Sequence, residues 1–394
     1  METQALLIGI DGGATKVSAW EIEYNKQQST FSLGTANAMR SYRDIDGYIP
    51  DYRPVDLNVQ LSERNTEIHP TEEEKQQAAV YVEACAQAIL ELTQKTGNNK
   101  VLIGIGMPGL KTDNKRGIAV VANGPRMVDY SEQLEKRLAE LRIDLVAPVD
   151  HLGSDADYCG IGENYAQEGL FRAVSNAYYL GGGTGVADAM KLDGELVTFD
   201  SAKTWTAKTW EMKSAEGISL ELVTSVSGIQ KTYAGFAQKP IEDLNEAGIY
   251  PLQIAERAKQ GEEAAIETFR VVNHNLAELL YERIVTLNRG CKNLFEFVNP
   301  NRQALSAVHP YIGKVFEVII IGQRLGDLFE DKFGMEMVRK PVLDQLNDRI
   351  QNSDLLTDEV KAHYKNLDTI IQVSKLREAP ALGAGVDAFL TKQL

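Results

Sequence analysis

Two apolar runs that each end in a glycine-rich turn constrain this chain more than any other feature. Leu-Leu-Ile-Gly-Ile at residues 6–10 leads into Asp-Gly-Gly-Ala-Thr-Lys at residues 11–16, and a further apolar run continues to Glu23. Ala-Tyr-Tyr-Leu at residues 177–180 leads into Gly-Gly-Gly-Thr-Gly at residues 181–185. Short apolar runs on either side of a glycine turn are typical of a strand, a tight turn and a second strand. The repeat of this pattern predicts a duplicated architecture.

A long helix is predicted after Thr71. The Thr71 hydroxyl and the Glu74 carboxylate can form a capping box, in which each satisfies a backbone amide of the first helical turn. Apolar residues then recur at helical spacing as far as Leu90, and Gly97 supplies a stop before a strand that begins at Val101. Strand, helix and strand in this order predict an α/β domain.

Further elements are expected along the rest of the chain. Helices are predicted at residues 131–141, from Ser154 or Asp155 onward, over most of residues 251–287 and from Ala381, and strands at residues 145–149 and 316–322. Residues 37–70 are polar, contain several tyrosines and prolines, and have little periodicity. We expect an irregular surface excursion there, with tyrosines that pack the loop or contact a ligand.

Composition and charge exclude several classes of protein. The 394 residues are enough for two domains, and 41 basic against 56 acidic residues give a net charge of −15. This charge would repel a phosphate backbone and no basic block offsets it, so no nucleic-acid partner is expected. No apolar stretch approaches the length of a membrane span, and no membrane partner is expected. Three widely spaced cysteines, Cys85, Cys159 and Cys291, fit a reducing compartment, and we expect a cytoplasmic protein.

Both glycine turns are candidate phosphate cradles. Glycines let backbone amides approach phosphate oxygens, and a carboxylate beside them can orient a hydrated Mg²⁺. The candidates are Asp11 (with Mg²⁺ through water), Gly12, Gly13, Thr15 and Lys16 in the first turn, and Gly182, Gly183, Thr184 and Gly185 in the second. Two such turns favour a bound nucleotide, whereas one alone would equally suit a plain hairpin. The spacing fits neither the P-loop signature nor the dinucleotide-binding fingerprint.

A candidate general base lies between the two turns, in Ser-Asp-Ala-Asp at residues 154–157. A carboxylate that follows a strand can accept the proton of an attacking hydroxyl group, which makes Asp155 the candidate. Helix capping is the alternative interpretation, because serine and aspartate are favoured at helix starts, and Asp155 could do both. His151 lies nearby in sequence, but a histidine at a strand end needs no catalytic role.

The order of these motifs resembles the ROK family of sugar kinases, within the hexokinase, heat-shock-protein and actin superfamily. Matching segments span nearly the whole chain: residues 9–16 and 182–185 for the two phosphate motifs, 104–125 for the segment that leads to the sugar pocket, 154–157 for the catalytic pattern, and 319–326 for the region near adenosine. The resemblance implies that ATP and Mg²⁺ are bound by Asp11, the two glycine turns and Gly322. It also implies that Asp155 is the base and that Asn123 contacts sugar hydroxyls.

The sequence departs from the family at several positions. Ala14 and Ala187 replace glycines, and Ser154 replaces an asparagine that helps to hold the sugar. The family's zinc-binding segment, with one histidine and three closely spaced cysteines, is absent, because no Cys or His occurs between Cys159 and His274. No zinc site is therefore expected.

The segment that stands in place of the zinc motif carries the remaining candidates for sugar binding. In the family this region supplies carboxylates to the sugar; Glu221 aligns best, and Glu211 is the second candidate. Either could instead be a solvent-facing helix residue. Trp205 and Trp210 either stack on a sugar or pack the shortened loop.

The fold class implied is α/β, with two actin-like, ribonuclease H-like lobes around a nucleotide and sugar cleft. Residues 1–158, completed by a C-terminal helix at 381–394, form one lobe, and residues 159–380 form the other. Asp155 would take the proton of a hydroxyl group of a hexose or N-acetylhexosamine as it attacks the γ-phosphorus of ATP. Mg²⁺, Lys16 and the loop amides would stabilise the charge that develops. A homodimer is expected by analogy with relatives.

Two other functions stay open at this point. A sugar-sensing relative would bind without turnover, which the changes at Ala14 and Ser154 and the missing zinc segment would explain. A repressor is disfavoured, because the first phosphate motif begins within a few residues of Met1 and leaves no room for an N-terminal DNA-binding module. A reductase-activator ATPase shares the Asp-Gly-Gly opening but needs cysteines for an iron–sulfur cluster, and no suitable pair is present.

Overall fold

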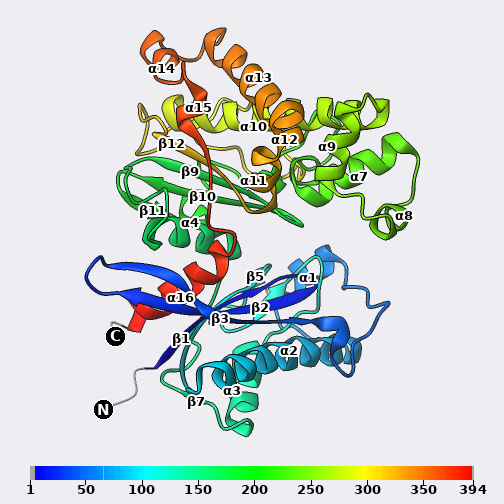
Figure 1. Ribbon diagram of the computed structural model, residues 1–394, viewed down its shortest axis with the longest axis vertical. Helices are drawn as coiled ribbons and strands as arrows, with labels where there is room; N and C mark the ends of the chain where they lie inside the picture. The colour runs from blue at the N-terminus through cyan, green and yellow to red at the C-terminus, as the bar shows by residue number, and fades with distance from the viewer. Residues whose placement is uncertain (1–4, 65, 393–394) are drawn as a thin grey trace. The chain divides into compact units, whose positions relative to one another are not determined.

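The computed structural model describes residues 5–64 and 66–392, which divide into two compact units (Figure 1). Unit 1 contains the residues up to Gln167 together with those from Glu378 onward, and unit 2 is Glu168–Arg377. The lobe boundary expected at residue 158 falls inside a helix of unit 1.

Unit 1 is built on a mixed sheet in the order β3-β2-β1-β4-β7, with β8 also paired to β4. The strands are β1 (Leu6–Gly12), β2 (Lys16–Asn25), β3 (Thr30–Ser41), β4 (Lys100–Gly106), β7 (Asp144–Leu145) and β8 (Leu152–Gly153). The first three strands are antiparallel to one another, whereas β4 runs parallel to β1. A separate two-stranded sheet pairs β5 (Leu110–Lys111) with β6 (Ile118–Val120).

Helices cover both faces of this sheet (Figure 1). The helices of unit 1 are α1 (Leu57–Arg64), α2 (Glu72–Thr96), α3 (Tyr130–Glu140), α4 (Asp155–Tyr165) and α16 (Ala379–Lys392), with a 3₁₀ turn η1 at Tyr42–Asp44; all but α1 and η1 cover the sheet. Ile8 and Ile10 of β1 belong to the apolar core beneath α2 and α3. Gly9, between them, faces the backbone of α16 on the other side, as the alternation of a strand requires.

Local sequence signals explain much of unit 1. The capping box is confirmed: the Glu74 amide donates to the Thr71 hydroxyl, the Thr71 amide donates to the Glu74 carboxylate, and Gly97 ends α2 in the left-handed conformation. The hairpin, the strand after Gly97 and the helix predicted at residues 131–141 are also confirmed. The irregular excursion at residues 37–70 is wrong in part. β3 continues to Ser41 because it pairs with β2, and α1 forms after the prolines.

The strand predicted at residues 145–149 is largely wrong. Only Asp144–Leu145 pairs with β4, and the chain then leaves the sheet before β8 returns to it. Val149 is buried, so its apolar character reflects packing against the core rather than membership of a strand.

Helix α16 packs on the sheet at backbone distance, because glycines face it. A methyl carbon added at Gly9 would lie 1.8 Å from the carbonyl oxygen of Ala381, and one at Gly104 would lie 1.8 Å from that of Ala384. Gly383 of α16 is equally close to α4, where an added carbon would lie 1.9 Å from the Tyr158 carbonyl oxygen. Only glycine permits these approaches, so α16 fixes the sheet and α4 to each other.

Unit 2 repeats the strand order of unit 1. Its sheet has the order β11-β10-β9-β12-β13, in which the first three strands in sequence form an antiparallel meander and the fourth pairs in parallel with the first. The strands are β9 (Ala177–Gly182), β10 (Val186–Leu192), β11 (Glu195–Val197), β12 (Val318–Gly322) and β13 (Ile371–Val373). The predicted duplication is confirmed.

Long helices dominate the rest of unit 2 (Figure 1). They and the shorter helical segments are α5 (Phe199–Ala202), η2 (Thr209–Glu211), α6 (Glu221–Thr224), α7 (Val226–Ala237), α8 (Ile241–Glu246), α9 (Pro251–Lys259), α10 (Glu263–Arg289), α11 (Gln323–Glu330), α12 (Lys332–Gly334), η3 (Met335–Arg339), α13 (Lys340–Gln351), α14 (Asp358–His363) and α15 (Leu367–Ile370). The helical character predicted for residues 251–287 is confirmed by α9 and α10.

A buried polar network anchors the segment that stands in place of the zinc motif. Asp188 of β10 accepts hydrogen bonds from the Thr209 amide and hydroxyl, at 3.0 and 2.8 Å, and pairs with Arg283 of α10 at 3.2 Å. Arg283 also donates to the Thr206 hydroxyl at 3.2 Å. Buried charges need such complete pairing, so these bonds hold residues 206–209 against the sheet.

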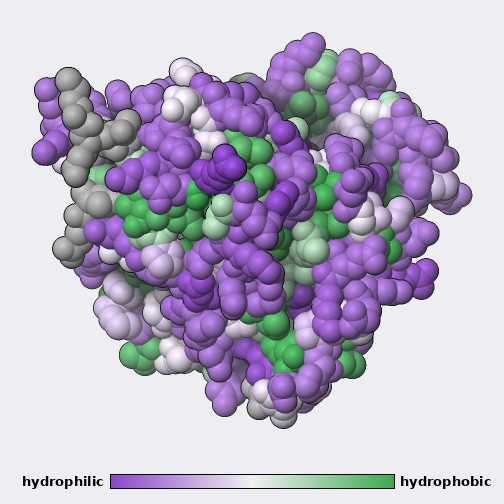
Figure 2. Space-filling view, turned by 90° about the horizontal axis from the view of Figure 1, so that it is seen from below, coloured by the Kyte–Doolittle hydropathy of each residue, from purple (hydrophilic) through white to green (hydrophobic). Residues whose placement is uncertain are grey.

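The surface carries mixed polarity. Figure 2 shows a mostly hydrophilic face, on which apolar residues gather in several separate groups. Within residues 5–64 and 66–392, no helix has the length and apolar character needed to cross a membrane.

Gly9→Ala tests the backbone contact between α16 and the sheet. The added methyl group cannot coexist with the Ala381 carbonyl, so we expect roughly 3 kcal/mol of destabilisation in urea unfolding, at the upper end for overpacked sites. Gly235→Ala is the control, because it lies within α7 with nothing within 4 Å of the added carbon. That variant should gain about 0.5–1 kcal/mol from helix propensity. Equal effects of the two substitutions would contradict the packing argument.

Candidate functional site

The first glycine turn leaves backbone amides available to a ligand. The Gly13 amide donates to the Lys16 carbonyl at 2.9 Å and closes the turn. The amides of Ala14 and Thr15 make no hydrogen bond to another residue that the structure describes. Thr15 and Lys16 are exposed. Adjacent free amides at a turn form a concave site suited to an anion.

Two stacked tyrosines hold this turn from behind. The rings of Tyr42 and Tyr81 stack with centroids 3.7 Å apart. The Tyr42 hydroxyl donates to the Gly13 carbonyl at 3.1 Å, and the Tyr81 hydroxyl donates to the Ala14 carbonyl at 3.0 Å. Burial raises the pKa of both tyrosines, so both hydroxyls stay protonated donors. The tyrosines thus turn two successive carbonyls inward. The tyrosine content of residues 37–70 did not predict that Tyr42 holds the glycine turn, and Tyr81 lies outside that segment.

Asp11 and Asp155 lie close enough to influence each other. Asp11 is near the end of β1, and Asp155 is the first residue of α4. The pKa of Asp11 is raised to about 7, first by burial and then by the negative charges of Asp155 and Glu378, while Lys16 opposes the rise. A cation would relieve this repulsion between carboxylates. A hydrated Mg²⁺ held through one carboxylate and ligand phosphates suits such a donor set.

Asp155 has the accessibility that a general base needs. Its side chain is partly exposed, and its Oδ1 accepts a hydrogen bond from the Ala156 amide at 3.0 Å. Ser154 occupies the N-cap position of α4 in extended conformation, but its side chain makes no capping hydrogen bond. Ser154 is therefore at the capping position without a side-chain cap, and whether Asp155 acts as base, as cap or as both stays a prediction.

A carboxylate of α16 supports α4 one turn after Asp155. The Tyr158 hydroxyl donates to Asp387 Oδ2 at 3.0 Å, and the His151 Nε2 lies 2.6 Å from the same oxygen. The network joins the chain before α4, the helix itself and α16. His151 therefore lies in a structural network, which its sequence position alone did not reveal.

Asn123 lies in the loop that follows β6, and its side chain is exposed. The same loop carries Gly124, where an added carbon would lie 3.3 Å from the Tyr81 hydroxyl. Tyr81 therefore touches both the first glycine turn and the loop of Asn123. Two segments that are far apart in sequence share one supporting side chain.

The second glycine turn, in unit 2, has the same local design as the first. The Gly183 amide donates to the Gly185 carbonyl at 2.9 Å, Thr184 is exposed, and its amide has no hydrogen-bond partner within the described part of the chain. Gly182 ends β9 with its Cα against Leu325, where an added carbon would meet the leucine at 2.7 Å.

The turn after β12 lies against the second glycine turn. Gly322 packs on Tyr179, because an added carbon would lie 2.2 Å from the tyrosine hydroxyl oxygen. Gln323 has φ 55° and forms an isolated bridge to Gly182. A non-glycine residue in the left-handed region stores strain that often marks a functional site. The sequence contained no signal for this conformation.

The two glutamate candidates have different partners. Glu221 Oε1 accepts the Val186 amide at 3.0 Å and lies against Gly185, where an added carbon would lie 2.4 Å from that oxygen. Glu211 forms an ion pair with Arg302 at 2.8 Å and accepts the Lys208 amide at 2.8 Å. Glu221 is therefore beside the second glycine turn, whereas the Glu211 carboxylate has structural partners.

The two tryptophans also differ in environment. Trp205 is buried and stacks on His309 with centroids 4.2 Å apart. Trp210 is 50% exposed. Trp205 thus packs the segment, which is the second of the two alternatives, and Trp210 stays accessible.

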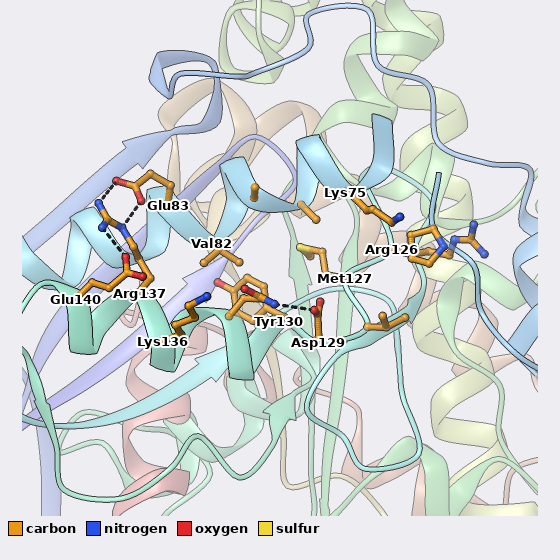
Figure 3. Close-up of a pocket in the computed structure, with 15 residues that line it drawn as sticks. Lys75, Val82, Glu83, Arg126, Met127, Asp129, Tyr130, Lys136, Arg137 and Glu140 are labelled. Atoms are coloured by element: carbon orange, nitrogen blue, oxygen red, sulfur yellow. Dashed lines mark hydrogen bonds and ion pairs between the residues drawn. The ribbon is translucent and has the colours of Figure 1, made fainter. Parts of the chain in front are cut away.

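A groove of about 470 Å³ lies elsewhere in unit 1, between α2 and α3 (Figure 3). Lys75 and Arg126 lie at one end and Glu83 and Arg137 at the other. Neither glycine turn nor Asp155 lines the groove. Its walls lack the free amides and the carboxylate pair, so it is not the candidate site for chemistry.

Over the described ranges, no group of three or more His, Cys, Asp and Glu side chains is arranged to hold a metal ion. The three cysteines are buried and unbridged.

Comparisons with known proteins identify the fold. No family model and no curated protein sequence matches the chain. Among solved structures, the ROK family glucokinase from Streptomyces griseus, in complex with glucose and AMPPNP, is similar over 98% of this chain and 100% of its own, with a TM-score of 0.58 and 16% identity. The ROK hexokinase from Thermus thermophilus is similar over 98% and 99%, with a TM-score of 0.55 and 15% identity.

A ROK family transcriptional regulator, a homolog of the E. coli MLC protein, has the same fold at 12% identity and a TM-score of 0.54, over 98% of this chain and 79% of its own. The chain therefore has the two-lobed α/β fold of the ROK sugar kinases. The predicted fold class is confirmed.

Tyr81→Phe tests how the first glycine turn is held. The change leaves the Ala14 carbonyl without its donor, so we expect about 1–2 kcal/mol of destabilisation and faster hydrogen exchange at residues 11–16. Tyr24→Phe is the matched control. Tyr24 packs on Phe31, and its hydroxyl has no hydrogen-bond partner among the described residues. If hydrogen exchange at residues 11–16 is the same in the Tyr81→Phe variant as in the unmodified protein, Tyr81 does not hold the first glycine turn.

Proposed function

We propose that this protein is an ATP-dependent sugar kinase that phosphorylates a hydroxyl group of a hexose or N-acetylhexosamine. The observation that carries the proposal is the Asp11 and Asp155 pair beside a glycine turn with free amides. A bound cation would offset the negative charges of Asp155 and Glu378 around Asp11, and Asp155 is partly exposed at a helix start. The similarity in fold to sugar kinases supports the same conclusion.

In this mechanism Asp155 accepts the proton of the sugar hydroxyl as the oxygen attacks the γ-phosphorus of ATP; the bond from that phosphorus to the β–γ bridging oxygen breaks, and ADP leaves. The amides of Ala14 and Thr15 and the ammonium group of Lys16 donate to phosphate oxygens. Asp11 orients the hydrated cation. When bound, Mg²⁺ neutralises charge on the phosphates during transfer.

The second glycine turn, with Gly182, Gly183, Thr184 and Gly185, and the neighbouring Gly322 are assigned to the nucleotide. Glu221 lies beside this turn, where it accepts the Val186 amide, and we assign it to the sugar on the family resemblance. Asn123 and Ser154 are assigned to sugar hydroxyls. Glu211 is the weaker candidate, because Arg302 already pairs with it.

The proposal extends to a homodimer in the cytoplasm that binds a small sugar. Relatives motivate the homodimer, and the three unbridged cysteines suit a reducing compartment. A sensor without turnover is the second candidate, since Ala14 and Ser154 differ from the family pattern and one structure of this fold is a regulator.

Release of ADP from Mg²⁺-ATP across a panel of hexoses and N-acetylhexosamines tests the proposal. We expect sugar-dependent turnover that EDTA abolishes. Asp155→Asn should lower kcat by about 10²–10⁴-fold, the usual contribution of a general base. Asp150→Asn is the control, because Asp150 pairs with Lys392 at the surface.

Each outcome separates the alternatives. Equal loss in both aspartate variants would point to damaged structure rather than a missing base. Sugar binding by calorimetry without turnover would favour the sensor. Iron in the purified protein would favour the reductase-activator ATPase.

A further inference from the structure

Helix α1 is attached to unit 1 in an unusual way. Gln60 is its one buried residue among those described, and its other side chains are exposed or partly exposed. Leu57, Val59 and Leu61 are each more than 40% exposed. A helix that buried an apolar face would be held by the hydrophobic effect, but α1 is not. Its attachment depends on polar groups.

The Gln60 side chain pairs with the backbone of Val121. Its Oε1 accepts the Val121 amide at 2.8 Å, and its Nε2 donates to the Val121 carbonyl at 3.1 Å and to the Val55 carbonyl at 2.6 Å. Val121 follows the last residue of β6. The side-chain amide therefore takes the place of a neighbouring strand at Val121. A fully buried amide that meets both groups of one residue fixes that residue in position.

A second polar contact holds the other end of the same loop. Arg126 is buried and pairs with Glu74 through two hydrogen bonds of 2.7 Å. It also pairs with Glu63, one turn after Gln60 on α1. Paired guanidinium and carboxylate groups of this kind have fixed geometry. The loop from Val121 to Arg126 is thus tied to α1 at both ends.

Asn123 lies between these two ties. Its own side chain is exposed, so nothing buried holds it directly. Its position follows from the backbone on either side and from Gly124, which rests on Tyr81. Removal of the tie at Val121 would leave the loop held at Arg126 and by the contact of Gly124 with Tyr81, with nothing to fix the backbone before Asn123.

We propose that Gln60 is a positioning residue for the sugar site: it holds the Val121 backbone so that Asn123 is presented to the sugar hydroxyls. The inference rests on the proposed function, because it assumes that Asn123 binds the sugar. It gives the excursion at residues 37–70 a role in substrate recognition. The hydrogen bonds of the Gln60 side chain go to Val55 and Val121 and not to the first glycine turn, so we expect ATP binding to be independent of Gln60.

Gln60→Glu tests the inference. A carboxylate can still accept the Val121 amide but cannot donate to the two carbonyls, which it would repel. We expect the sugar KM to rise about tenfold while the ATP KM stays unchanged, because a displaced loop weakens only one substrate's binding. Hydrogen exchange at residues 118–126 should accelerate, with no change in β4.

Gln77→Glu is the matched control. Gln77 is a second buried glutamine of unit 1, and its Oε1 accepts the Ile49 amide, an interaction that glutamate retains. Its sugar KM and its exchange at residues 118–126 should match those of the unmodified protein. Glu63→Gln is a second test, since it weakens the other tie at a partly exposed position and should raise the sugar KM to a smaller extent.

The outcomes separate this inference from the proposed function. If the unmodified protein phosphorylates a sugar and both Gln60→Glu and Glu63→Gln leave its KM unchanged, the inference is overturned and the function stands. If Gln60→Glu does not fold, Glu63→Gln and its exchange decide. If the unmodified protein neither binds nor phosphorylates any sugar of the panel, the function fails and the inference fails with it.

Discussion

Backbone contact between α16 and the rest of unit 1 is the constraint on which its candidate site depends. Gly9, Gly104 and Gly383 remove the side chains that would separate α16 from β1, β4 and α4. Asp11 lies near the end of β1, and Asp155 begins α4. Both carboxylates are therefore carried by elements that α16 fixes, and the Asp387 network adds a polar tie to the same assembly. The close approach of Asp11 and Asp155 is a product of helix packing rather than of any direct bond between them.

Polar contacts, in contrast, shape the loops around this framework. Tyr42 and Tyr81 hold the first glycine turn by its carbonyls, and Gln60 holds the Asn123 loop by its backbone. In unit 2, Asp188 holds the segment that replaces the zinc motif. Apolar contacts have no preferred direction, whereas hydrogen bonds to backbone groups do. Apolar and backbone packing thus holds the sheet and helices together, and buried polar side chains fix the positions of the loops.

Sequence patterns predicted the features that local chemistry determines. The glycine turns, the capping box at Thr71 and the repeated strand–turn–strand pattern each follow from residues close together in the chain. Helix α1 did not, because its one buried residue is a glutamine whose partner lies 61 positions away. The tyrosine pair and the left-handed Gln323 are also tertiary effects, without a periodic or compositional trace. The aspartate motif could be located from sequence, but its charge environment required Glu378, from the far end of the chain.

The distance in sequence between α16 and its partners has a consequence for biosynthesis. The ribosome makes residues 379–392 only after all of unit 2. Until then, the glycine-lined faces of β1 and β4 have no helix to cover them, and α4 lacks the surface that orients it. The final alignment of Asp11 with Asp155 therefore arises only after unit 2 has been synthesised, and a nascent chain would carry both carboxylates well before it could bring them together.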